Sequence, residues 1–191
     1  QMCIRDRLYT FSFFGIFLIN VRFFFHVWGY SEYSAGIALT PIPVTASLAG
    51  VFSGRFVRRL GTRPTATLSA LCLGGGLFLM VGLTGHQAQY WTHAALPMTL
   101  IGFGVGSAIA VLNTSATIHL PPGRFSMGSA FISTGRQIGA AIGVALALAL
   151  YSAVNRGADP LARAHLAWIV FAIAGMVAGG DEGTPHAEST G

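Results

Sequence analysis

Residues 127–151 read MGSAFISTGRQIGAAIGVALALALY, an apolar run that is interrupted by Arg136 and Gln137. About 20 apolar residues allow a helix to cross about 30 Å of hydrocarbon, so this run predicts a membrane-spanning helix. Arginine keeps its proton in proteins and cannot lower the cost of burial by becoming neutral. One face of the helix is therefore predicted to meet water or a polar partner instead of lipid.

The composition of the whole chain also indicates a membrane environment. Of the 191 residues, 53% are hydrophobic and only 9% are charged, whereas a soluble domain carries about 25% charged residues. The net charge of +5 comes with no basic run interleaved with aromatic residues, so we expect no nucleic-acid partner. The two cysteines and the histidines show no metal-ligand spacing, so we expect neither a metal nor a cofactor.

Six apolar windows of membrane-spanning length follow one another along the chain and are separated by short, turn-rich segments. They cover residues 8–27, 35–57, 65–83, 94–113, 127–151 and 163–179. The predicted fold class is an all-α integral membrane protein, with one six-helix transmembrane bundle over residues 8–180. Residues 1–7 are interpreted as a linker remnant or a junction artefact, and the polar residues 181–191 as a disordered cytoplasmic tail. Asn113 is interpreted as the end of the fourth helix.

The arginines predict how the bundle is oriented. Arg55, Arg58, Arg59 and Arg63 lie between the second and third windows, whereas the segments between the first two windows and between the third and fourth carry no arginine. Because cytoplasmic loops are enriched in basic residues, the arginine-rich side is predicted to be cytoplasmic. An even number of spans then places both termini in the cytoplasm of a cell membrane.

Polar side chains recur along one face of the fifth predicted helix. Ser129, Ser133 and Arg136 are separated by four and three residues, and Gln137 lies beside them. At about 1.5 Å per residue, Arg136 is expected to lie near the bilayer centre. These four residues are candidates for a substrate-facing cavity. Two interpretations of Arg136 remain open: a cavity-lining cation that attracts a substrate, or an internal staple between two helices.

Two further patterns concern helix packing and helix shape. Gly135, Gly139 and Gly143 recur at a spacing of four residues, which is typical of helices whose backbones approach closely. Pro41 and Pro43 fall inside the second window and predict a kink there. The kink is a candidate hinge, although a static bend is an equally good interpretation.

Three stretches resemble a known family of transporters. In SGRFVRRLGTRPTATL, residues 53–68, Gly54, Arg59, Gly61 and Arg63 match the loop signature of the major facilitator superfamily. Arg58 departs from that signature, which has aspartate at this position, and this departure weakens the inferred gating role of the loop. Residues 27–50 and 121–145 resemble the corresponding helices in the C-terminal half of the fourteen-span drug:proton antiporters.

The resemblance implies a function and a missing partner. It implies a C-terminal six-helix bundle that works with an N-terminal bundle outside this chain, and that exports small amphipathic compounds in exchange for protons. It also implies gating roles for Gly54, Arg58, Arg59, Gly61 and Arg63. None of the six acidic residues lies within a predicted span, so the proton-carrying groups are expected in the other bundle.

Two other function classes were weighed. An intramembrane serine protease of the rhomboid type needs a serine in a GxSG turn and a histidine inside another span. The stretches GVFSG and GVGSA do not fit that motif, so no enzyme is expected. A non-transporting membrane scaffold or subunit stays open as an alternative.

The arginine-rich segment leads to a test of orientation. We expect a topology reporter that is fused after Pro64 to be cytoplasmic, and one fused after Gln87 to be on the opposite side of the membrane. Alkaline phosphatase, which is active only outside the cytoplasm, can serve as the reporter. High activity after Pro64 with none after Gln87 would contradict the predicted orientation.

Overall fold

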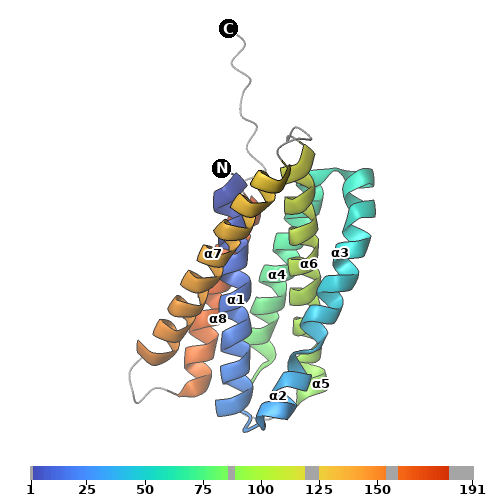
Figure 1. Ribbon diagram of the computed structural model, residues 1–191. Coiled ribbons are helices and arrows are strands. Elements are labelled where there is room, and N and C mark those ends of the chain that lie inside the picture. The colour runs from blue at the N-terminus through green and yellow to red at the C-terminus, as the bar shows by residue number, and fades with distance from the viewer. Residues whose placement is uncertain (1, 86–88, 119–124, 154–158, 181–191) are drawn as a thin grey trace.

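The computed structural model is a bundle of helices that describes residues 2–85, 89–118, 125–153 and 159–180 (Figure 1). Every regular element within these ranges is an α-helix. Six helices are long and apolar enough to cross a membrane, which confirms the predicted number of spans. The helices are α1 (Met2–His26), α2 (Glu32–Leu39), α3 (Pro41–Leu60), α4 (Thr62–Leu83), α5 (Tyr90–His93), α6 (Ala95–Ile118), α7 (Phe125–Ala153) and α8 (Pro160–Gly180).

The long helices form two similar groups of three. α1 packs mainly against α7 and α8, and α6 packs mainly against α3 and α4. The two groups are joined where α4 packs against α8, whereas α1 and α6 contact each other only lightly. Exchanging α1 with α6, α3 with α7, and α4 with α8 reproduces the same main pairs of neighbours. A space between α1 and α6 is therefore a consequence of the architecture.

Glycine residues allow the closest helix contacts on both sides of that space. A Cβ atom added to Gly139 would lie 2.6 Å from the carbonyl oxygen of Arg7, and one added to Gly143 would lie 2.2 Å from that of Phe11. The glycine stripe of α7 therefore packs directly on the backbone of α1, which confirms the predicted close packing.

On α6, alternate glycines face two different neighbours. A Cβ at Gly106 would lie 2.1 Å from the carbonyl oxygen of Ala46 on α3, and one at Gly104 would lie 2.6 Å from the backbone nitrogen of Leu73 on α4. Positions two residues apart point to different sides of a helix, so α6 is held closely between both helices.

Large aromatic side chains fill the core towards the end of the bundle where α1 finishes at His26. Phe23, Phe24 and Trp168 are fully buried and pack as tilted or edge-on rings. The indole Nε1 of Trp168 donates a hydrogen bond of 3.0 Å to Oδ1 of Asn20, which is also fully buried. This pairing satisfies a polar group that would otherwise be costly in the core.

The second predicted span is divided between two helices. α2 ends at Leu39 and α3 begins at Pro41, the position where a missing N–H is best tolerated. The predicted interruption is therefore present, and it lies just before Pro41, while Pro43 lies in the first turn of α3. The function of the two prolines as a hinge stays a prediction.

The turn between α3 and α4 is shorter than expected. Only Gly61 separates the two helices, and its φ of +90° is one that residues with a side chain rarely adopt. Gly54 was expected to flank the turn, but it lies inside α3, where a Cβ would meet nothing within 4 Å. The prediction for Gly54 was wrong because the helix continues through the arginines to Leu60.

The described ranges also bear on the two ends of the chain. α1 begins at Met2, so residues 2–7 continue the first helix. Residues 181–191, for which a disordered tail was expected, lie outside the described residues. The assignment of residues 1–7 as a remnant or an artefact stays a prediction.

The glycine contacts of α6 lead to a test of stability. Gly106→Ala places a methyl group against the backbone of α3, so we expect a loss of about 1–3 kcal/mol. Gly75→Ala is the matched control, because its methyl group would enter open space and alanine favours the helix by about 0.5–1 kcal/mol. Thermal unfolding in detergent measures both. Equal stability of the two variants would contradict tight packing at Gly106.

Candidate functional site

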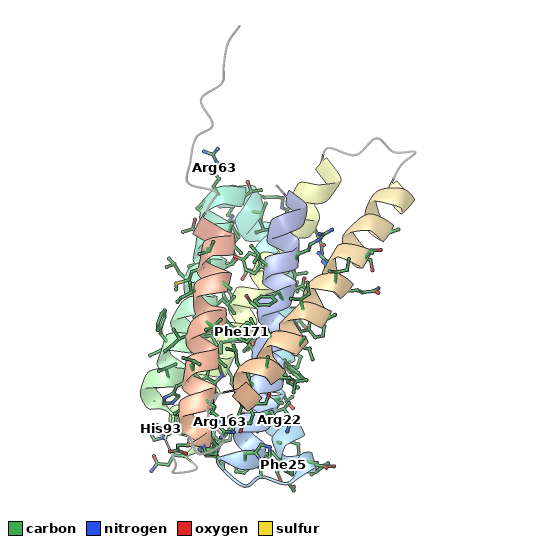
Figure 2. All side chains as sticks on the ribbon, turned by 90° about the vertical axis from the view of Figure 1, so that its left-hand side faces the viewer. Arg22, Phe25, Arg63, His93, Arg163 and Phe171 are labelled. Carbon is green, nitrogen blue, oxygen red and sulfur yellow. The ribbon has the colours of Figure 1, made fainter. Side chains whose placement is uncertain are left out.

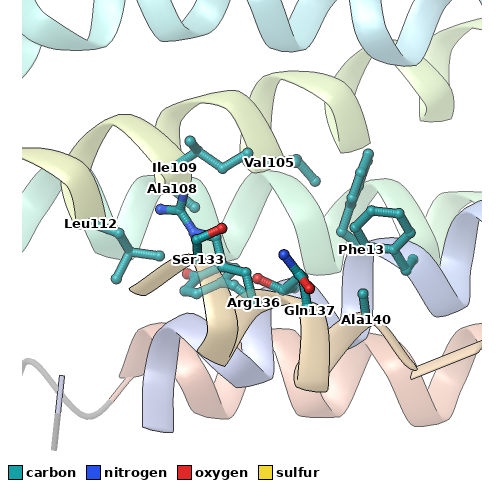
Figure 3. A pocket seen from close by; sticks show the side chains of 12 residues that line it. Phe13, Val105, Ala108, Ile109, Leu112, Ser133, Arg136, Gln137 and Ala140 are labelled. Carbon is teal, nitrogen blue, oxygen red and sulfur yellow. The ribbon is translucent and has the colours of Figure 1, made fainter. Parts of the chain in front are cut away.

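A pocket of about 250 Å³ lies between α1, α6 and α7, at the space that the helix packing leaves open (Figure 3). Its walls are aromatic on α1, aliphatic on α6 and polar on α7. The lining residues are Tyr9, Thr10, Phe13 and Phe14 of α1, Val105, Ala108, Ile109 and Leu112 of α6, and Ser133, Arg136, Gln137 and Ala140 of α7.

Arg136 contributes the charge of this pocket and bridges two helices. Its Nη2 donates a hydrogen bond of 2.7 Å to Oδ1 of Asn113 on α6. α7 packs against α1 and is inclined to the other helices, so this bond reaches a helix that is not one of the main packing partners of α7 (Figure 2). A hydrogen bond from a guanidinium group to an amide oxygen is charge-assisted and stronger than a neutral one.

The position of Arg136 along the bundle differs from the expectation. Asn113 lies closer to Ile118, the last residue of α6, than to Ala95, the first. The guanidinium group is at the level of Asn113, so it lies towards the arginine-rich end of the bundle instead of near the middle. The estimate from the length of the helix was wrong because α7 starts at Phe125 and runs at an incline.

The other predicted cavity residues can now be placed. Ser133 and Gln137 line the same pocket and are exposed, while Arg136 is half-buried. The side chain of Ser129 lies outside the part of the chain that is described. Three of the four candidates are therefore brought together by one face of α7.

Asn113 is the functional candidate that sequence reasoning missed. It was interpreted as the end of a helix, but α6 continues to Ile118, and the amide accepts the hydrogen bond of Arg136. A usable signal existed: a polar residue in an apolar helix and a cation in the next helix satisfy each other better than either satisfies itself in lipid.

The loop candidates form a separate group. Arg55, Arg58 and Arg59 are exposed and line their own recess at the end of α3, and none of them lines the pocket of Arg136. Arg63 lies in the first turn of α4, beyond Gly61. The structure therefore keeps the predicted cavity residues and the predicted loop residues apart.

The pocket suits the binding of an organic molecule and offers little for covalent chemistry. Its apolar walls would cover an aromatic or aliphatic body, while Arg136, Gln137 and Ser133 would orient a polar group. No acidic residue lines it. Among the described residues, no three His, Cys, Asp or Glu side chains come together as a metal site.

Comparisons with known proteins agree with this arrangement. The family model described as Major Facilitator Superfamily matches residues 8–180. The methyl viologen resistance protein SmvA of Salmonella typhimurium is 32% identical over 63% of this chain and 24% of its own length. The multidrug resistance protein Stp of Mycobacterium tuberculosis is 29% identical over 71% of this chain and 25% of its own length.

A third relative shows the same pattern. The puromycin resistance protein pur8 of Streptomyces alboniger is 27% identical over 70% of this chain and 27% of its own length. The chain thus spans about a quarter of the length of these relatives.

The bond between α6 and α7 leads to a second test of stability. Asn113→Leu removes the acceptor of Arg136, and we expect the protein to lose about 1.5–3 kcal/mol, the usual range for a hydrogen bond to a charged group. Thr99→Val is the control, because the Thr99 hydroxyl bonds only to its own helix at Leu96. Thermal unfolding is measured in detergent. In an Arg136→Leu background the effect of Asn113→Leu should nearly vanish, and equal losses in both backgrounds would contradict the pairing.

Proposed function

Because this chain belongs to the major facilitator superfamily, we propose that it forms the C-terminal six-helix half of a secondary active transporter that exports small amphipathic compounds. The observation that carries the proposal is the pocket between α1, α6 and α7, which combines apolar walls with a single cation. A transporter needs such a site inside the membrane, where the body of a substrate is shielded and one polar group is recognised.

The proposed substrates follow from the chemistry of the pocket walls. Tyr9, Phe13 and Phe14 offer aromatic surfaces, and α6 offers aliphatic ones, so a compound with a flat apolar body fits. The relatives carry names that refer to resistance to methyl viologen, to puromycin and to multiple drugs. These names support the export of organic compounds of different shapes, which an apolar pocket with few directional groups would tolerate.

Transport is proposed to require a second helical bundle. The pocket has walls on three helices, and the exposed Ser133 and Gln137 point to a side that this chain does not close. Alternating access would arise when two bundles rock around the site, so that it opens to one face of the membrane at a time. The protein is proposed to lie in the inner or plasma membrane, with both termini in the cytoplasm.

Proton coupling is proposed to depend on the second bundle. The acidic residues of this chain are Asp6, Glu32, Asp159, Asp181, Glu182 and Glu188. Each lies at the end of a candidate span or outside the spans. A carboxylate that carries protons through the membrane would therefore come from the partner bundle, where Arg136 could attract it electrostatically.

Arg136 is proposed to act as a cation that faces the substrate and that Asn113 holds in place. The hydrogen bond to Asn113 restricts the guanidinium group, while the pocket exposes the same group to a bound molecule. Two further proposals concern movement: the α3–α4 turn with Gly54, Arg58, Arg59, Gly61 and Arg63 would take part in gating, and Pro41 and Pro43 would permit bending between α2 and α3.

Substitutions at Arg136 test its role in the complete transporter. We expect Arg136→Leu to lower efflux at least tenfold while the protein still inserts, because removing a charge from a span favours insertion. Arg136→Lys keeps the charge but loses the planar fork of donors, so we expect an intermediate efflux rate. The measurement is substrate efflux from cells, normalised to the amount of folded transporter.

The control for these variants is Thr134→Val. Thr134 is exposed on α7, does not line the pocket, and donates to its own helix at Ala130. This variant should transport normally. Normal efflux by Arg136→Leu would rule out the substrate-facing role, and lost folding in both arginine variants would indicate a purely structural staple.

A further inference from the structure

A second candidate site lies at the arginine-rich end of α3, away from the pocket of Arg136. Arg55, Arg58 and Arg59 line one recess of about 350 Å³ and all three are exposed. Their spacing of three and four residues places them on one side of the helix. Arg63 is also exposed at this end, but it is not among the residues that line the recess, and it projects from the end of the bundle (Figure 2).

The recess is positively charged without a nearby acid in its own helices. Neither α3 nor α4 contains an aspartate or a glutamate. Arg58 also stands where the resembling loop signature has aspartate, so a pair of opposite charges is replaced by two like charges. Three arginines this close repel one another, and an anion between them would relieve the repulsion.

Exposed apolar side chains continue from the recess along α3. Leu48 is 54% exposed, Val51 is 69% exposed and Phe52 is 50% exposed. Leu48, Val51 or Phe52, and Arg55 follow the i, i+3 and i+4 spacing, so they form one stripe along the helix. The stripe is apolar over the length of the candidate span and becomes cationic where the span ends.

We propose that this recess binds the headgroup phosphate of an anionic phospholipid, with one acyl chain lying along the apolar stripe of α3. The cations and the apolar stripe together match the two parts of a lipid molecule. The guanidinium group has a planar fork of donors that pairs with two oxygens of a phosphate, and it is less strongly hydrated than a lysine. Basic side chains just beyond a span are also at the depth of the headgroups.

The alternative occupants make different predictions. Arginines that only orient the protein in the membrane would need no particular lipid, because the positive-inside rule acts during insertion. A soluble phosphate compound would need the recess but not the apolar stripe. An acidic segment of a second bundle would occupy the recess in the complete transporter and would exclude the lipid.

The test is a lipid titration of the purified protein in a nonionic detergent. Dioleoylphosphatidylglycerol and dioleoylphosphatidylcholine are the probes, and native mass spectrometry counts the lipid molecules that stay bound. We expect tighter binding of phosphatidylglycerol, and a loss of about fivefold in affinity for each arginine that is replaced by glutamine. Arg55→Gln/Arg58→Gln/Arg59→Gln should therefore lose most of the preference.

The controls separate a lipid site from general electrostatics. Arg63→Gln removes one charge from the same end of the bundle but not from the recess, so its affinity should stay within twofold of the unchanged protein, while Arg59→Gln should lose about fivefold. Arg→Lys at all three positions keeps the charge but loses the fork of donors, and it should recover only part of the affinity. Circular dichroism and gel filtration check folding, and the single variants carry the test if the triple variant does not fold.

Four results would overturn the proposal. One is equal binding of the two lipids by the unchanged protein, and another is an equal loss in Arg63→Gln and Arg59→Gln. Efficient displacement of the lipid by soluble glycerol phosphate would indicate a site for free phosphate compounds. The last is lipid binding by the isolated chain that is absent from the complete transporter, which would assign the recess to the second bundle.

Discussion

Close contact between helix backbones at glycine is the interaction on which the rest of this structure depends. Lipid tails are as apolar as leucine, so apolar exclusion does little to bring helices together inside a membrane, and van der Waals packing has to do it. Gly139 and Gly143 let α7 lie directly on α1, and Gly104 and Gly106 let α6 lie between α4 and α3. These contacts define two groups of three helices, and the functional pocket lies in the space between their central helices, α1 and α6.

The polar side chains inside the spans fall into two kinds. Ser53 and Ser69 are buried and donate to carbonyl oxygens four residues earlier in their own helices, so they are satisfied without a neighbour. Asn20 and Asn113 instead accept hydrogen bonds from Trp168 and Arg136 on other helices. The second kind fixes which helices face each other. Asn20 does so in the closed core, and Asn113 does so at the edge of the pocket.

The two arginine groups illustrate how position decides the role of the same charge. Arg136 is half-buried, is bonded to an amide, and lies beside aromatic and aliphatic walls, where it would select one polar group on a bound molecule. Arg55, Arg58 and Arg59 are exposed beyond the apolar part of α3, at the depth where lipid headgroups are found. A chain with so few charged residues thus keeps its cations at two places where a negatively charged partner is within reach.

The sequence by itself determined the number of spans, the all-helical class and the family, because hydrocarbon requires long apolar helices and each helix is visible as a local pattern. It also indicated that Arg136 needs a polar surrounding and that the glycine stripe of α7 packs closely. Only the tertiary structure decided that α1 receives that stripe, that Asn113 accepts the bond of Arg136, and that the guanidinium group lies towards the arginine-rich end. The physical reason is that a periodic pattern shows which face of a helix is small or polar, whereas the neighbour of that face depends on how distant helices cross.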